Sequence, residues 1–393
     1  MDSYTDLVTK ANQQTNRIFE ICKNIGFPKD KIILIPRNSK YGKDNVLDYA
    51  ASTVTYIVQQ LKQKSWDCKI IFDLPDEGFA TIPLKLFDIV TRQLILDYNI
   101  SPKNIIYITG AAAVSSSTNA YNKLCIKMNY FPISVYYTNG LEINQRTQGG
   151  EFRDTFHSRE PNRKKKFLCY NRNPRPHRVA LLAQLLKRDL VKHGYLSFNA
   201  DAHSVKGSFN QVKRIFPNLI NDTTLNIRPI LNDLPINLSL VENHPSMFYP
   251  SDTDIMMYKS SLFSIVTETL FENNTNYQNE DDLEVAHCYP IPMFSEKTWK
   301  TIRGKHPFIL ATVPHSLRAF RELGYRTFHP YIDETYDTIE NEEERLLAIV
   351  NEVDRLCKMS DNDTREWLYK VHEITDHNFQ KLSEATMYIK EVW

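Results

Sequence analysis

The sequence predicts an α/β fold of two βαβ-type domains followed by a C-terminal helical tail. Short, continuously apolar runs alternate with longer stretches of helical spacing, which is typical of parallel sheets covered by helices on both faces. This alternation occurs twice along the chain, and a polar segment with three of the eleven glycines separates the two series. The length of 393 residues suits about two to three domains.

The first series defines a domain over residues 1–150. Short runs rich in β-branched residues predict strands, and the longer stretches between them have apolar residues at the spacing of a helix. The predicted strands are 31–36, 68–74, 104–109 and 132–138, and the predicted helices are 46–61 and 84–96.

The second series follows a linker at residues 151–165, which is polar and ends in a run of Arg and Lys. It defines a second domain over 166–340, and residues 341–393 have helical spacing. The predicted strands of this domain are 166–172, 195–199, 261–268 and 306–312, and its predicted helices are 177–191, 295–303 and 316–323.

Composition excludes several classes of protein. The chain has 48 Lys and Arg against 47 Asp and Glu, so nucleic acid is an unfavoured partner, because dedicated DNA binders carry a basic excess. The six cysteines form no CxxC pair and the histidines form no HExxH motif, which argues against a zinc site. No secretory signal and no membrane-spanning run is evident in the sequence. We therefore expect a cytoplasmic protein without a membrane span.

The first candidate site is the basic loop after the predicted strand 166–172. Ligands in α/β folds bind at the carboxyl ends of strands, and guanidinium groups suit phosphate oxygens. The alternative interpretation is a solvated basic loop in which Pro176 opens the next helix. The candidate ligands of a diphosphate are Asn171, Arg172, Arg175 and Arg178.

The second candidate site combines the end of the strand 261–268 with the start of the helix 295–303. Ser295 is a candidate N-cap, a glutamate at position 296 can accept two ribose hydroxyls, and Lys297 can neutralise a phosphate. Glu268 ends its strand, where a carboxylate often faces a ligand. The alternatives are an ordinary capped helix with a favourable acidic residue, and an exposed glutamate that enters a polar loop.

Taken in order, the motifs SIVTE, SEKTW, HPFIL, HSLRAFRELGYRTF and DETYD, with CYNRNPRPHR upstream, resemble the nucleotide-sugar half of GT-B glycosyltransferases. The fucosyltransferase-like and exostosin-like groups are the most similar. The resemblance covers residues 166–337 with a gap in the middle. It implies two Rossmann-like domains, with the helices of 341–393 packing back on the N-terminal domain.

The resemblance also implies an activity. The expected reaction is inverting, metal-independent transfer of a sugar from a GDP- or UDP-linked donor to a hydroxyl acceptor such as a glycan, without a cofactor. It implies that Glu268 lies near the donor sugar and that Glu296 binds the ribose. Lys297, with Arg172 or Arg175, would then bind the diphosphate.

An inverting transferase needs a carboxylate to take the proton of the acceptor hydroxyl. Asp76 and Glu77 follow the predicted strand 68–74, and we prefer Glu77 because Gly78 allows a tight turn after it. Thr109 and Gly110 end the next strand and are candidates for acceptor binding. The alternatives are a surface turn of the type Pro-Asp-Glu-Gly and a bare turn after Thr109.

Other hypotheses come from two further features. Asp252 and Asp254 form a DxD triplet, which in metal-dependent glycosyltransferases binds a divalent cation, although helix capping explains the pair better. The basic stretch 163–178 suggests nucleic-acid binding as an alternative function. A catalytically silent scaffold with the same fold is the remaining alternative.

Overall fold

The computed structural model describes two compact units, each considered by itself below. The described residues are 27–35, 46–74, 84–109, 134–138, 163–171, 173–198, 202–219, 252–272, 292–385 and 389–391. In the first unit they fall within 27–138 and 389–391, and in the second within 163–272 and 292–385. Both units contain a sheet of mainly parallel strands with helices, so the predicted α/β class is confirmed.

The sheet of the first unit has the strand order β1-β2-β3-β4-β9. Its first four strands are parallel, and Ile33 lies opposite Ile70 while Ile71 lies opposite Ile106. All four of these isoleucines are at most 2% exposed, as expected for strands buried on both faces. The strands are β1 (Ile32–Ile35), β2 (Lys69–Leu74), β3 (Ile105–Thr109), β4 (Ser134–Thr138) and β9 (Ile389–Glu391).

Strand β9 corrects the prediction that residues 341–393 are helical throughout. It pairs antiparallel with β4, with Tyr137 opposite Lys390. An edge strand such as β4 presents unpaired N–H and C=O groups, and the backbone of β9 pairs with them. The C-terminal residues therefore return to the sheet of the first unit.

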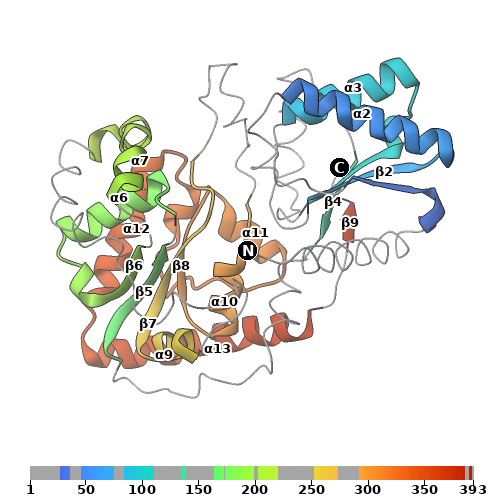
Figure 1. The fold of residues 1–393 in the computed structure, drawn as a ribbon. Coiled ribbons are helices and arrows are strands. Elements are labelled where there is room, and N and C mark those ends of the chain that lie inside the picture. Colours follow the sequence, from blue (N-terminus) through green and yellow to red (C-terminus); the bar gives the residue numbers. More distant parts are fainter. Residues whose placement is uncertain are drawn as a thin grey trace. The chain divides into compact units, whose positions relative to one another are not determined.

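The two described helices of the first unit lie side by side on one face of the sheet (Figure 1). They are α2 (Val46–Gln63) and α3 (Leu84–Tyr98), and Ile57, Leu61 and Leu94 bury their side chains completely. Because the parallel strands follow one another in sequence order, right-handed crossovers place both helices on the same face. Short 3-10 turns, η1 (Lys29–Lys31) and η3 (Pro102–Asn104), lead into β1 and β3.

The sheet of the second unit is parallel and has the order β6-β5-β7-β8. The chain steps from β5 to β6, then returns past β5 to form β7 and β8, so the strand order reverses between β5 and β7. Every residue of β7 is buried. The strands are β5 (Lys165–Asn171), β6 (Gly194–Phe198), β7 (Ser261–Thr267) and β8 (Phe308–Ala311).

The reversal places the crossover helices that follow β5 and β7 on opposite faces of this sheet (Figure 1). These helices are α6 (Pro176–Lys187) and α10 (Glu296–Arg303), and both begin at the carboxyl edge of the sheet. The other helices in the described part of the unit are α7 (Ala202–Ile215), α9 (Asp252–Lys259), α11 (Ser316–Glu322), α12 (Glu342–Cys357) and α13 (Asp361–Glu384).

The long C-terminal helices belong to the second unit. Helix α12 contacts α6, β5 and β8 through a stripe that includes Leu346, Ile349 and Val353, and α13 contacts α10. Their packing on the first domain stays a prediction. Within the described parts of the chain, no helix combines the length and the apolar character needed to cross a bilayer.

Candidate functional site

The carboxyl ends of β5 and β7 are joined by side chains at the point where the strand order reverses. Thr267 Oγ1 donates a hydrogen bond of 2.7 Å to Asn171 Oδ1. Both residues are buried, and Asn171 Nδ2 lies 3.2 Å from Cys169 Sγ. Ligands of open α/β sheets bind at such a reversal, outside the carboxyl ends of the strands. The predicted residue Asn171 therefore lies at this position and ties the two strands together.

Glu268, the residue after β7, ties this strand to the start of α10. Its Oε1 accepts hydrogen bonds from the backbone N–H of Ser295 at 2.9 Å and from Thr298 Oγ1 at 2.5 Å. Ser295 is the N-cap of α10, as predicted, and its Oγ accepts from the backbone N–H of Lys297. A carboxylate at a helix N-terminus is favourable because it faces the positive end of the helix dipole.

The second carboxylate oxygen of Glu268 has no hydrogen-bond partner among the described residues, although the side chain is 1% exposed. A buried, unpaired carboxylate oxygen is unfavourable, because it has lost its water without gaining a donor. A hydroxyl group of a bound ligand would remove this penalty. Sequence reasoning placed Glu268 at a ligand site but did not predict its contact with Thr298.

Arg178 holds the backbone at the end of β7. Its Nη2 donates to the carbonyl oxygens of Thr267 and Glu268 at 3.0 and 3.1 Å, and its Nη1 donates to the carbonyl of Asn173. Burial lowers the pKa of Arg178 to about 10, so the side chain is charged at neutral pH. The predicted contact of Arg178 with a diphosphate stays a prediction, and the contacts observed are with the protein backbone.

His177 supports the same segment and was not predicted as a site residue. Its Nε2 lies 3.0 Å from the carbonyl oxygen of Glu268, and its ring stacks on Phe271 with the centroids 5.1 Å apart. Burial, together with the neighbouring arginines, lowers the pKa of His177 well below its ordinary value. The ring is therefore neutral, and Nε2–H donates to the carbonyl. The sequence around His177 gave no signal of this role, because Pro176 before it indicates only the start of a helix.

Glu296 and Lys297 form an ion pair in the first turn of α10. The two charged atoms are 2.8 Å apart, and about a fifth of each side chain is exposed, 20% for Glu296 and 22% for Lys297. Burial alone would raise the pKa of Glu296, but the charge and hydrogen bond of Lys297 lower it overall. The pair therefore places an ionised carboxylate and an ammonium group beside the N-terminus of α10, where both can reach a ligand.

The DETYD motif supports the neighbouring edge of the sheet. Tyr336 OH accepts a hydrogen bond from the backbone N–H of Leu310 on the edge strand β8. Asp337 Oδ1 accepts from the backbone N–H of Leu317 at the start of α11, and burial raises the pKa of Asp337. The carbonyl of Asp337 also accepts from the backbone N–H of His315. The motif thus fixes the loop between β8 and α11.

For other predicted residues, the structure gives a position in the fold without describing side-chain contacts. Arg175 is exposed at the N-cap of α6. Thr109 ends β3, and Asp252 and Asp254 lie in the first turn of α9, but their side chains are outside the described residues. Asp76, Glu77, Gly110 and Arg172 lie outside the described residues altogether. Among the described residues, no cluster of His, Cys, Asp or Glu suits a metal ion.

The basic stretch considered for nucleic-acid binding contacts the protein itself. Arg163 Nη1 donates to the carbonyl oxygens of Tyr258 and Ser261, and Lys166 Nζ donates to the carbonyl of Met359. These bonds orient the side chains toward the second unit. Arg163 and Lys166 are therefore less available to bind the phosphates of a nucleic acid.

Comparison of the chain with family models, curated proteins and solved structures found no match. The functional proposal therefore depends on the geometry at the carboxyl edge of the second sheet and on the order of the sequence motifs.

Proposed function

We propose that the chain is a GT-B type glycosyltransferase with two Rossmann-like domains, and that its second unit binds the nucleotide-sugar donor. One observation carries the proposal. The half-buried pair of Glu296 and Lys297 begins α10, whose N-cap residue Ser295 is bound by Glu268 at the carboxyl edge where the strand order reverses. Nucleotides bind at this position in open α/β sheets.

The chemistry of the three side chains matches the parts of a nucleotide sugar. The ammonium of Lys297 and the positive end of the α10 dipole favour the diphosphate, because both attract negative charge. The ionised carboxylate of Glu296 accepts hydrogen bonds from the two ribose hydroxyls. Oε2 of Glu268 accepts a hydrogen bond from a hydroxyl of the donor sugar.

In the proposed reaction, the acceptor hydroxyl attacks the anomeric carbon as the bond to the nucleoside diphosphate breaks. Glu77, or Asp76, takes the hydroxyl proton, and Thr109 with Gly110 helps to hold the acceptor. The electron pair of the broken bond stays on the diphosphate. Lys297, with Arg172 or Arg175, neutralises the added charge, which stabilises the transition state.

A thermal-shift screen of the full chain tests the proposal. GDP, UDP, CMP and dTDP are compared, each with EDTA or with manganese. A nucleotide at about 100 times its dissociation constant adds about 2.7 kcal/mol to the stability of the folded state. We expect one nucleoside diphosphate to raise the unfolding temperature in EDTA. A shift with manganese alone would support the alternative site at Asp252 and Asp254, and no shift would contradict the proposal.

A further inference from the structure

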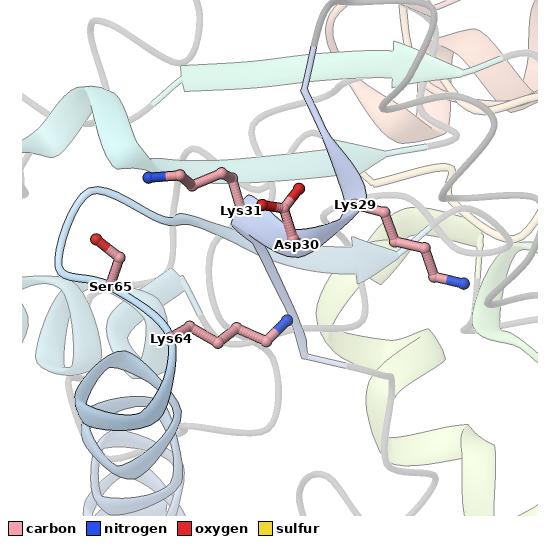
Figure 2. A pocket seen from close by; sticks show the side chains of 5 residues that line it. All are labelled: Lys29, Asp30, Lys31, Lys64 and Ser65. Atoms are coloured by element: carbon pink, nitrogen blue, oxygen red, sulfur yellow. The ribbon is translucent and has the colours of Figure 1, made fainter.

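A hollow opens at the amino-terminal edge of the first sheet, away from the edge where α/β folds bind their substrates. Lys29, Asp30 and Lys31 of η1 line one side of it, and Lys64 and Ser65, which follow α2, line the other (Figure 2). In a parallel sheet, every segment that leads from a helix into a strand lies at this edge. The segments that precede β1, β2 and β3 therefore lie together here.

This edge carries an excess of positive charge. The three segments, the adjoining helix ends and the first residue of β2 contain six lysines and three aspartates, whereas the whole chain has a net charge of only +1. The lysines are Lys29, Lys31, Lys62, Lys64, Lys69 and Lys103, and the aspartates are Asp30, Asp67 and Asp97. We call these lysines the basic edge.

Two lysines of the basic edge make their described hydrogen bonds to neutral oxygens, and one is in an ion pair. Lys31 pairs with Asp67 at 2.6 Å. In contrast, Lys64 Nζ donates to the carbonyl oxygen of Ile32, and Lys69 Nζ donates to the carbonyl of Lys103 and the amide oxygen of Asn104. A bond to a neutral oxygen orients an ammonium group and keeps its positive charge. The edge therefore attracts an anionic partner.

Large apolar side chains are exposed at the same edge. Trp66 is 45% exposed and directly follows Ser65 of the hollow, while Leu96 and Tyr98, at the end of α3, are 68% and 37% exposed. They are three of the six large hydrophobic residues that are exposed in the described part of the chain. The negative end of the α2 dipole explains Lys62 and Lys64, but it does not explain exposed apolar side chains.

We propose that this edge of the first unit docks on a membrane surface that contains anionic lipid. Trp and Tyr favour the boundary between headgroups and acyl chains, an aliphatic side chain such as Leu96 enters the acyl region, and lysines attract acidic headgroups. Single-stranded nucleic acid would use the aromatic rings but gain nothing from Leu96. Docking by the amino-terminal edge leaves the carboxyl edge of the sheet open to an acceptor.

Co-sedimentation of the full chain with lipid vesicles tests this proposal. We expect binding to vesicles of phosphatidylcholine with phosphatidylserine, little binding to phosphatidylcholine alone, and weaker binding at high salt. Replacement of Lys29, Lys62 and Lys103 by Gln together should weaken binding about a hundredfold, because each lysine contributes roughly fivefold. The Trp66→Ser variant should also weaken binding, and vesicles should shift the tryptophan fluorescence of the native chain to the blue more than that of this variant.

Matched variants in the second unit provide the controls. Lys192, Lys213 and Lys358 are exposed there, and their joint replacement by Gln removes the same charge. Tyr369, which is 70% exposed on α13, is the control for Trp66. Unfolding temperatures show that each variant is folded. Equal binding by the two triple variants, no binding to either vesicle, or binding to poly(U) RNA in place of vesicles would each overturn the proposal.

Discussion

The two sheets differ in the order of their strands and in where their charged groups lie. In the first unit, β1 to β4 follow one another in sequence order, and the charged residues of the basic edge are largely exposed. In the second unit, β5 lies between β6 and β7, and Glu268 and Arg178 are almost completely buried at the reversal. Buried charged side chains thus lie where the strand order reverses, at the sheet edge where both α6 and α10 begin.

The largest change in the free energy of unfolding is expected when a buried arginine is replaced, whereas replacement of an exposed arginine should change it little. The Arg178→Met variant should lower the free energy of unfolding by about 3–5 kcal/mol, because three carbonyl oxygens lose their donor at a buried position. Urea denaturation measures this change. The control is Arg318→Met, whose side chain is 59% exposed and should tolerate the change. A similar loss in both variants would contradict the role assigned to burial.

Mild acid should destabilise the second unit selectively. Burial lowers the pKa of His306 to about 3 from its ordinary value of 6.5, and that of His177 also falls well below 6.5. Each ring binds fewer protons when the unit is folded than when it is unfolded. The stability is thus complete above pH 6.5 and decreases as the pH falls toward 3, by about 1.4 kcal/mol per pH unit for each histidine.

Thermal unfolding between pH 7 and pH 5 measures this effect. The described residues of the first unit contain no histidine, so its transition should move less over the same range. In the His306→Gln variant, the pH slope of the second transition should be smaller. If the slope is the same in the variant, His306 is not the titrating group.

A smaller effect is expected from the bond across the reversal. Thr267→Val keeps the shape of the side chain but removes the hydroxyl that donates to Asn171, which should lower stability by about 1–2 kcal/mol. Thr55→Val in α2 is the matched control, because the hydroxyl of Thr55 is exposed and bonds only within its own helix turn. Chemical denaturation should distinguish the two variants, and equal values would contradict a structural role for the bond.

The smallest effect is expected at the basic edge. Lys31 and Asp67 form an exposed ion pair, so Lys31→Met should leave the unfolding temperature of the chain unchanged. A clear decrease in a thermal-unfolding experiment would show that the edge is part of the structural core of the first unit. The exposed charges of the first unit would then contribute to stability as the buried charges of the second unit do, and the difference between the two sheets would be lost.

Much of the fold follows from local sequence patterns. The strands from Ile32 to Ala311 are short runs in which apolar residues predominate, and the helices α2, α3 and α10 have regular spacing, so their positions were predicted to within a few residues. Helix α7 was not predicted, although Val205 and Val212, which lie on one face of it, are buried. The strand β9 was read as part of the helical tail, because three residues that pair with an edge strand carry too short a signal.

The candidate site was predicted less completely than the fold. Ser295 and Glu268 stood out because one caps a helix and the other ends a strand. Their contact with each other, and the part played by Thr298 and His177, depend on pairing between segments distant in the sequence. The strand order, which brings these residues to one edge, follows from tertiary packing and leaves no local signal.

The most direct test of the proposed donor site is calorimetric titration of the full chain with GDP and UDP in EDTA. The native protein is compared with Lys297→Met and with Lys192→Met, which removes an exposed lysine of the second unit that is also in an ion pair. We expect one of the two nucleotides to bind, about tenfold or more weakly to Lys297→Met, and unchanged to Lys192→Met. Equal affinity for all three proteins, or no binding to the native chain, would contradict a donor site at the start of α10.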